Sequence, residues 1–292
     1  MSRFLHRPAT TMITVAPTGA EHRRADVPQL PTTPEEIAAE AAACEAAGAA
    51  MIHIHVRDTE HAPTLDLPRV REVVAAVRES SSLVVQLSTG GSVHDAMPDR
   101  LAVLEAEPDS CSLTLGTVNF GYDVFMNPWG FVVELFRSSR DRGIVPEFEV
   151  FDLGQLSTLR RLLDREGLPA GDRVHVDLVT GVPGGMPGTA DAVVACVAAM
   201  PEQVTSWSAT GIGRSHLPVL AAALAAGGHL RVGMEDTVVW GRGPDGPVPV
   251  ASNADLVARA ARVATDLQRP PMTVAGARDL LGLPAPAGPA HA

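Results

Sequence analysis

The sequence is poor in cysteine, and this limits the cellular compartments and the kinds of cysteine-based site that we expect. Its 292 residues include only Cys44, Cys111 and Cys196, an odd number spread through apolar segments. Such a set supplies neither a disulfide framework nor a CxxC metal site, and it suits a reducing environment. We therefore expect a cytoplasmic location.

Long hydrophobic runs and excess positive charge are also missing. The longest apolar run, residues 217–226, contains Pro218 and is too short to span a bilayer, and residues 1–12 lack the apolar core of a secretory signal. A net charge of −11 argues against nucleic acid or an anionic membrane as a partner. With 46% hydrophobic and 20% charged residues, the composition is that of a soluble globular protein, for which we expect a small-molecule ligand.

Strand-like and helix-like segments alternate along the chain. The first predicted helix has Thr33 as N-cap, Pro34 in its first turn and Glu36 three residues after the cap, and it runs to Gly48. We expect strands at residues 12–18, 50–58, 83–89, 110–116, 146–152, 173–181, 203–211 and 230–236. Eight strand–helix units predict a (β/α)8 TIM barrel, one domain over residues 1–283 that ends in a C-terminal helix. The Pro/Ala/Gly tail at 284–292 is expected to be disordered.

Polar side chains alternate with Ile, Val and Leu in these strands. If the aliphatic side chains face the helices, the other face is too polar to fill an ordinary core. In a barrel, inward residues near the carboxyl ends of the strands form the active site. The inward set is Thr14, Thr18, His53, His55, Gln86, Ser88, Ser112, Thr114, Glu147, Glu149, His175, Asp177, Arg231 and Glu235.

Two histidines separated by one residue are the strongest single signal. His53 and His55 share one face of a strand, and neutral imidazole is the commonest metal ligand among side chains. The second and eighth strands of a barrel lie one strand apart, which lets Glu235 join them in a two-His, one-carboxylate set with open positions. The alternative is that Glu235 only pairs with Arg231, four residues earlier on the same face.

Other motifs fit less well. The spacing from His53 and His55 to Glu60 imitates a cupin metal site, but a helix directly before the strand contradicts that all-β fold. Amidohydrolase barrels carry His-x-His on the first strand and histidine on the fifth, where this chain has Glu147 and Glu149. The glycine-rich segments 90–91 and 180–188 match no phosphate-binding fingerprint. Trp207 and Trp240 have the rings to stack on adenine, although packing is the commoner role.

Eight motifs in order resemble the β-keto acid cleavage enzymes over roughly residues 10–283, and the similarity is closest to the branch that acts on 3-keto-5-aminohexanoate in lysine fermentation. The motifs are Thr18-Gly-Ala-Glu21, Leu30-Pro-Thr-Thr-Pro-Glu-Glu36, His53-Ile-His-Val-Arg57, Gln86-Leu-Ser-Thr-Gly-Gly91, Pro146-Glu-Phe-Glu149, Gly181-Val-Pro-Gly-Gly-Met186, Gly211-Ile-Gly-Arg214 and Gly227-Gly-His-Leu-Arg-Val-Gly-Met-Glu-Asp236.

The resemblance implies a tetrameric acyltransferase of the same barrel fold with a divalent metal, typically zinc. Such enzymes condense a β-keto acid with acetyl-CoA to give acetoacetate and a new acyl-CoA. No lysine is needed for a Schiff base, and none occurs in the eight predicted strands.

The family's site residues fall on matching positions of this chain. The metal ligands fall on His53, His55 and Glu235, and the base on Asp236, which Arg231 orients. Glu149 matches a further polar site residue, and Glu21 matches the residue that meets a substrate amine. The remaining substrate contacts fall on Ser88, Gly91, Ser112 and Thr114, of which Ser112 replaces a Thr and Thr114 an Asn of the 3-keto-5-aminohexanoate branch.

Two alternatives of different class remain at this point. One is a metal-dependent retro-aldolase or hydrolase on the same barrel, which would not consume acetyl-CoA. The other is a protein that binds a metal or a small anion without turnover.

Overall fold

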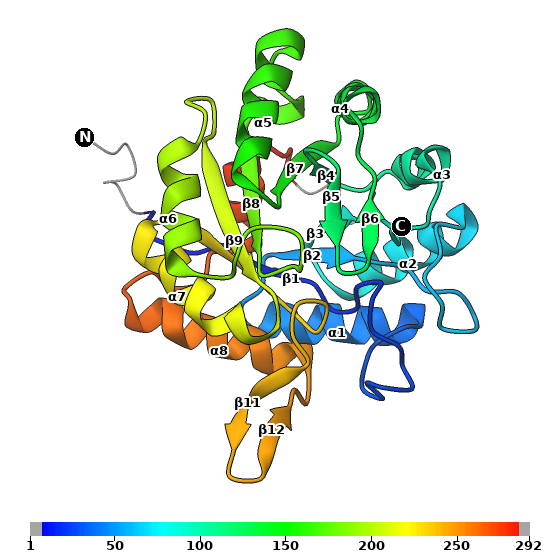
Figure 1. Cartoon of the computed structure of the whole chain (residues 1–292). Helices are drawn as coiled ribbons and strands as arrows, with labels where there is room; N and C mark the ends of the chain where they lie inside the picture. Colours follow the sequence, from blue (N-terminus) through cyan, green and yellow to red (C-terminus); the bar gives the residue numbers. More distant parts are fainter. Residues whose placement is uncertain (1–7, 286–292) are drawn as a thin grey trace.

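A closed parallel barrel forms the centre of the computed structural model, which describes residues 8–285 (Figure 1). The strand order around the barrel is β1-β10-β9-β8-β7-β4-β3-β2. Each of the eight predicted segments contains most or all of one barrel strand, so the predicted (β/α)8 architecture is confirmed. The strands are β1 (Ile13–Val15), β2 (Met51–Ile54), β3 (Val84–Leu87), β4 (Ser110–Thr114), β7 (Val145–Val150), β8 (His175–Thr180), β9 (Ser206–Gly211) and β10 (His229–Val232).

Helices surround the barrel and close one of its ends. The surrounding helices are α1 (Pro34–Ala47), α2 (Leu67–Ser80), α3 (Met97–Ala102), α4 (Trp129–Asp141), α5 (Leu153–Glu166), α6 (Ala190–Ala199), α7 (His216–Ala226) and α8 (Asn253–Asp266), with 3-10 turns at Val103–Ala106, Ala170–Asp172 and Gly213–Ser215. The predicted capping box of α1 is present, because the Thr33 side chain accepts from the Glu36 N–H at 3.2 Å and the Glu36 carboxylate accepts from the Thr33 N–H at 3.2 Å. Gly48 ends this helix in the left-handed region, with φ of 111°.

Alternation along β2 separates two environments. Ile52 and Ile54 pack outward into the main core between strands and helices. Met51 points inward and packs with Val84 and with Leu281 of α9 (Val274–Leu281), which plugs the amino-terminal end of the barrel. The barrel is therefore open for ligands only at the carboxyl ends of its strands.

Most of the polar residues inside the barrel are bonded to one another. The His175 ring contacts the hydroxyls of Ser206 at 2.7 Å and Ser208 at 3.3 Å. The Asp177 carboxylate accepts from Ser208 at 2.7 Å and from Thr210 at 2.6 Å. These bonds explain how so polar an inward face is tolerated, since buried polar groups are costly only when they lack partners.

Two hairpins in the loops after β4 and β10 were not predicted. One is β5 (Val118–Phe120) with β6 (Asp123–Phe125), and the other is β11 (Val239–Gly243) with β12 (Gly246–Pro249), which projects from the body of the molecule in Figure 1. Their strands are three to five residues long and largely exposed, so they carry no alternating buried face for a sequence pattern to detect.

The last barrel strand is shorter than predicted. It ends at Val232 rather than at Asp236, because Gly233 packs so tightly on the Ala16 backbone that a Cβ there would lie 1.9 Å from the Ala16 carbonyl oxygen. The Asp236 N–H then donates to the Gly233 carbonyl at 3.0 Å. Glu235 and Asp236 are therefore presented from a tight turn and not from the strand.

Several smaller predictions concern the rest of the chain. The three cysteines are free and buried. No helix within residues 8–285 combines the length and the apolar character needed to cross a membrane. Of the predicted tail, residues 286–292 lie outside the described residues, while the carbonyl of Pro284 accepts a hydrogen bond from Arg278 at 2.7 Å.

Candidate active site

A cavity of about 910 Å³ lies at the carboxyl ends of the barrel strands. Its walls come from the loops that follow the strands and from both hairpins. The residues that line it include Glu21, His55, Ser88, Gly91, Glu149, Arg231, Glu235 and Asp236, together with Arg214, His216, Trp240, Arg242 and Arg259. The position of the cavity is that of the active site in TIM-barrel enzymes.

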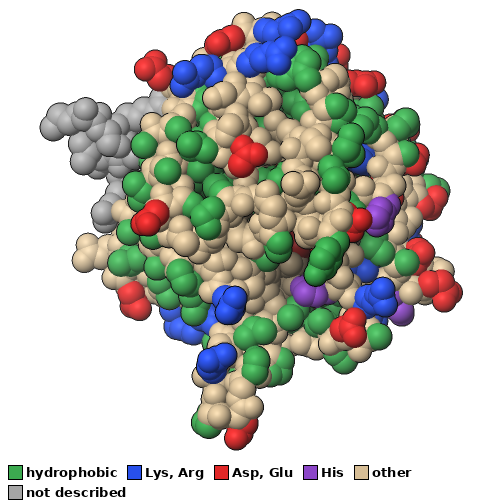
Figure 2. Space-filling view, viewed as in Figure 1, with side chains coloured by type: hydrophobic (Ala, Val, Ile, Leu, Met, Phe, Trp, Pro, Cys, Tyr) green, Lys and Arg blue, Asp and Glu red, His purple; other side chains and the backbone are tan. Residues whose placement is uncertain are grey.

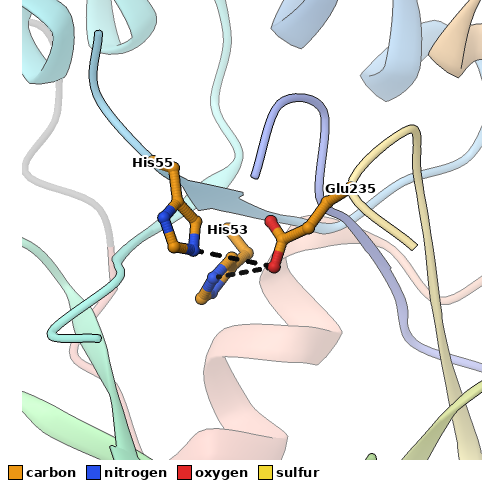
Figure 3. Close-up of side chains that lie close together, drawn as sticks. All are labelled: His53, His55 and Glu235. Atoms are coloured by element: carbon orange, nitrogen blue, oxygen red, sulfur yellow. Dashed lines mark ion pairs between the residues drawn. The ribbon is translucent and has the colours of Figure 1, made fainter. Parts of the chain in front are cut away.

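The three predicted metal ligands converge on one point (Figure 3). Glu235 Oε1 lies 3.7 Å from His53 Nε2 and 3.6 Å from His55 Nε2. Ligand atoms around a tetrahedral ion at 2.0–2.1 Å are roughly 3.3 Å apart, so both distances to Glu235 are close to those of a bound ion. The three ligand atoms all lie within 4.8 Å of one another. Among residues 8–285 this is the one group of three or more His, Cys, Asp or Glu side chains close enough to hold a metal ion, and the exposed Glu60 is not part of it.

Hydrogen bonds orient the imidazole of His53 for a metal. Its Nδ1 lies 2.5 Å from Gln86 Oε1, which can only accept, so Nδ1 carries the proton and Nε2 keeps its lone pair. The register between β2 and β3 places His53 directly beside Gln86. Gln86 in turn donates to Ser110 at 3.1 Å, which fixes its own orientation.

The protonation states of these ligands also suit a cation. Burial lowers the pKa of His53 to about 3, so the ring is neutral at physiological pH. Burial alone opposes ionisation of Glu235, but the positive field of Arg231 together with the two imidazoles outweighs it and lowers the pKa of Glu235 to about 2. Glu235 Oε2 is buried without a hydrogen-bond partner. A buried carboxylate oxygen that lacks a donor is the atom that a bound cation would satisfy.

Arg231 lies at the centre of the acidic part of the site. Its guanidinium donates from Nη2 to Asp236 Oδ1 at 3.0 Å and from Nη1 to Glu149 Oε1 at 3.4 Å, and it also bonds Glu235 Oε1. Glu235 therefore pairs with Arg231, as the alternative required, and it also faces the two histidines. A single arginine thus contacts three carboxylates and orders them.

Two of these carboxyl groups have pKa values near neutrality. Burial raises the pKa of Asp236 to about 7 against the opposing field of Arg231. Burial likewise raises the pKa of Glu149 to about 7, again opposed by Arg231 and by the hydroxyl of Thr114, which donates to it at 2.8 Å. Groups with pKa values near the working pH are suited to moving protons, and both lie in the cavity wall.

The predicted substrate contacts divide into two groups. Glu21, Ser88 and Gly91 line the cavity, with Glu21 exposed in the loop after β1. Ser112 and Thr114 lie inside the barrel but do not line the cavity. Ser112 Oγ accepts from the N–H of Thr89 at 3.2 Å, so Ser112 braces the loop that carries Ser88 and Gly91.

Two buried arginines shape the loops of the site through hydrogen bonds that the sequence does not reveal. Arg57, only 2% exposed, donates to the Gly19 carbonyl at 2.6 Å and to the His22 carbonyl at 3.0 Å, and so it fixes the loop that presents Glu21. Arg100 donates to the Thr89 carbonyl at 2.6 Å and fixes the loop after β3. These three bonds join separate segments of the chain, and no local sequence pattern predicts them.

Comparisons with known proteins agree with this geometry. Residues 10–283 match the family model described as beta-keto acid cleavage enzyme. Over 274 residues the chain is 35% identical to a 3-keto-5-aminohexanoate cleavage enzyme of Acetoanaerobium sticklandii (93% of this chain, 98% of that one) and 37% identical to one of Fusobacterium nucleatum (93% and 97%). It is 33% identical to a 3-oxoadipate:acetyl-CoA acetyltransferase of Cupriavidus necator (94% and 95%).

A solved structure shares the fold. The apo structure of ObcA superposes with a TM-score of 0.74 at 22% sequence identity, covering 88% of this chain and 66% of that chain. This chain thus spans just under two thirds of the length of ObcA, and the likeness concerns the barrel.

Proposed function

Because this chain belongs to the β-keto acid cleavage enzyme family, we propose that it condenses a β-keto acid with acetyl-CoA to give acetoacetate and a new acyl-CoA. In this exchange the bond between the keto carbon and the carboxymethyl carbon breaks, as does the acetyl–sulfur bond. The carboxymethyl carbon becomes bonded to the acetyl group and the CoA sulfur to the other acyl group, so no oxidant or reductant is needed.

The observation that carries the proposal is the convergence of His53, His55 and Glu235 beside Arg231 and Asp236 in one cavity. The first three residues would hold a divalent ion, and zinc is the metal we propose. When bound, such an ion supplies a Lewis acid that stabilises negative charge on the substrate's keto oxygen and carboxylate.

The protein's own residues provide the proton transfer. Asp236 accepts the proton from the carbon between the two carbonyl groups, and Arg231 holds its carboxylate in place for that step. Glu149 adds a second carboxyl group whose pKa lies near 7 in the same wall. Ser88 and Gly91 contact the substrate from the loop after β3, where Ser112 braces the backbone, and Thr114 acts on the site through Glu149.

We propose an amine-bearing substrate, with 3-keto-5-aminohexanoate as the leading candidate. Glu21 lines the cavity as an exposed carboxylate and would attract a cationic tail while it repels an acidic one. Two of the relatives compared are named for 3-keto-5-aminohexanoate, which has a cationic tail, and one for 3-oxoadipate, which has an anionic tail. The enzyme must therefore distinguish substrates by the charge of their tails. With this substrate, we propose a role in lysine degradation.

The remaining features of the proposal concern the protein as a whole. We propose one catalytic domain over residues 1–283, a homotetramer and a cytoplasmic location. Three free, buried cysteines support the reducing compartment. Light scattering of the purified protein tests the tetramer, since a monomer would give a quarter of the expected mass.

The experiment that tests the function is a screen of β-keto acids with acetyl-CoA in which acetoacetate is measured. The zinc-loaded protein should form acetoacetate and a new acyl-CoA in equal amounts. Removal of the metal should abolish both products, and His55→Ala should lose bound zinc by elemental analysis while staying folded. Cleavage of the keto acid without consumption of acetyl-CoA would instead identify a retro-aldolase or hydrolase.

A further inference from the structure

Three arginines from separate elements line the cavity, and this set is called the arginine wall. Arg214 lies in the turn before α7, Arg242 in β11 and Arg259 in α8, and all three line the same cavity as Glu235 and Asp236. Within residues 8–285 none of the three forms an ion pair with a carboxylate. Figure 2 shows basic side chains where the β11–β12 hairpin leaves the body of the molecule. In a chain of net charge −11, these positive groups are concentrated where a ligand enters.

Contacts with Trp240 hold the guanidinium of Arg259 in place, and two of its nitrogens remain without a hydrogen-bond partner. Its guanidinium carbon lies 3.9 Å from the centre of the Trp240 ring, and Nη1 donates to the Trp240 carbonyl at 2.7 Å. Nε and Nη2 are buried and have no hydrogen-bond partner. A buried guanidinium edge without an acceptor costs free energy unless a ligand supplies one, and phosphate oxygens match its planar fork.

His216 adds a second unpartnered group to the same cavity. It is 4% exposed, it lines the cavity, and neither of its ring nitrogens has a hydrogen-bond partner. Trp207, the other tryptophan considered for stacking, is 1% exposed and packs on Gly228 in the core, so Trp240 alone of the two reaches the cavity. The cavity therefore offers a ligand the guanidinium of Arg259, the imidazole of His216 and the indole ring of Trp240.

The size of the cavity points to a ligand larger than the keto acid. At about 910 Å³ it is near the upper end of the roughly 300–1,000 Å³ usual for small-molecule sites, whereas a six-carbon acid beside the metal ligands occupies a small part of it. Acetyl-CoA would have to bring its thioester to the side of the cavity that holds Glu235 and Asp236, and its other end carries phosphates. We propose that Arg214, Arg242 and Arg259 bind the phosphates of acetyl-CoA, an inference that rests on the proposed function.

Kinetics with a truncated donor test this assignment. Acetyl-pantetheine has the same thioester as acetyl-CoA but lacks the nucleotide and its phosphates. Wild-type protein should use acetyl-CoA with a kcat/KM at least 100-fold higher. In the Arg214→Ala/Arg242→Ala protein, and separately in Arg259→Ala, this ratio should fall at least tenfold through KM for acetyl-CoA, while KM for the keto acid stays unchanged.

Matched control variants separate the site from general effects of charge and stability. Arg161 stacks on Trp129 at 3.9 Å, the same separation as in the Arg259–Trp240 pair, but it lies outside the cavity. Arg161→Ala therefore removes an equal stack, and Arg160→Ala removes an exposed charge on the same helix. Both controls should keep the KM for acetyl-CoA of the wild type.

A binding measurement tests the role of the three arginines without requiring turnover. In calorimetry, adenosine 3′,5′-bisphosphate should bind the zinc-loaded wild type, and its affinity should fall as the salt concentration rises. Its affinity for the arginine variants should be at least tenfold lower. It should compete with acetyl-CoA. Failure of every keto acid to react while the bisphosphate still binds through these arginines would reject the proposed function but not a nucleotide site.

Three results would overturn the inference. Equal use of acetyl-pantetheine and acetyl-CoA by wild type would mean that the phosphates are not bound. An unchanged KM in the arginine variants would place them elsewhere. Bisphosphate binding that does not compete with acetyl-CoA would assign the wall to a separate nucleotide.

Discussion

Arg231 and Asp236 are joined by two hydrogen bonds, from Nη2 to Oδ1 at 3.0 Å and from Nε to Oδ2 at 3.3 Å. The pairing is bidentate and both side chains are buried, so the carboxylate has one fixed orientation. A base that is held in place by one charge and desolvated at the same time can be strong enough to take a carbon-bound proton near neutral pH.

Replacing Asp236 by Asn tests its role as the base. The amide keeps the shape of the side chain but cannot accept the proton, so activity should fall by about 10²–10⁴-fold while zinc content is unchanged. The informative measurement is exchange of the substrate's acidic protons with deuterated water, corrected for the exchange that occurs without enzyme. Full retention of the enzyme-dependent exchange in Asp236→Asn would transfer the role to another group, with Glu149 the first candidate.

Gly19 packs against Glu235, a proposed metal ligand, and its replacement by Ala should weaken metal binding. Its φ is +65°, and a Cβ at this position would lie 2.6 Å from Cγ of Glu235, so that side chain would have to move. We expect zinc affinity to drop by about 10–100-fold, the size seen when outer contacts of metal ligands are lost.

The matched control for Gly19 is Gly143. Its φ is +73°, and nothing lies within 4 Å of a Cβ built there. Gly143→Ala carries the same kind of backbone strain without the clash, so its zinc affinity in a competition titration should equal that of wild type. Equal affinities for Gly19→Ala and Gly143→Ala would show that contact with Glu235 is unimportant.

Glu21 should set the preference for an amine-bearing substrate. Wild type should favour 3-keto-5-aminohexanoate over uncharged 3-ketohexanoate in kcat/KM, by about fivefold, because the carboxylate is exposed and solvent screens the pair. Glu21→Gln should remove most of that difference and leave turnover of 3-ketohexanoate as it was. Identical kcat/KM values for the two substrates in wild type would defeat the assignment.

Buried histidine makes the barrel sensitive to acid. Burial lowers the pKa of His175 to about 3 from 6.5, so the folded protein holds this ring neutral. Its contribution to the free energy of unfolding is complete above pH 6.5 and declines by up to about 1.4 kcal/mol per pH unit as the pH falls toward 3. Between pH 7 and pH 5, wild type should therefore lose about 2 kcal/mol more than His175→Gln. Urea unfolding at both pH values measures this, with exposed His94→Gln as the control; parallel losses in all three proteins would contradict it.

The convergence of His53, His55 and Glu235 was predictable from the sequence for two physical reasons. The two-residue period of a strand places His53 and His55 on one face, and the circular order of barrel strands brings β10 within one strand of β2. The prediction was wrong about where β10 ends, because close packing determines that boundary. The contact of Gly233 with Ala16 ends the strand four residues earlier than predicted, so Glu235 and Asp236 lie in a loop.

Depth within the barrel and long-range bonds could not be read from the sequence. Alternation correctly places Ser112 and Thr114 inside the barrel, but whether an inward residue reaches the cavity depends on the loops above it. The same holds for the arginines of the cavity wall. Arg242 and Trp240 belong to a short exposed hairpin and Arg259 to a distant helix, so only the folded chain reveals that they line one cavity.

The most direct test of the proposed reaction follows the acetyl carbons. With acetyl-CoA labelled by ¹³C in the acetyl group and an unlabelled β-keto acid, NMR of the zinc-loaded enzyme's products should show the label in the two acetyl-derived carbons of acetoacetate and none in the new acyl-CoA. His55→Ala should give neither product. Label that stays in acetyl-CoA while the keto acid is cleaved, or that appears as free acetate, would contradict the account.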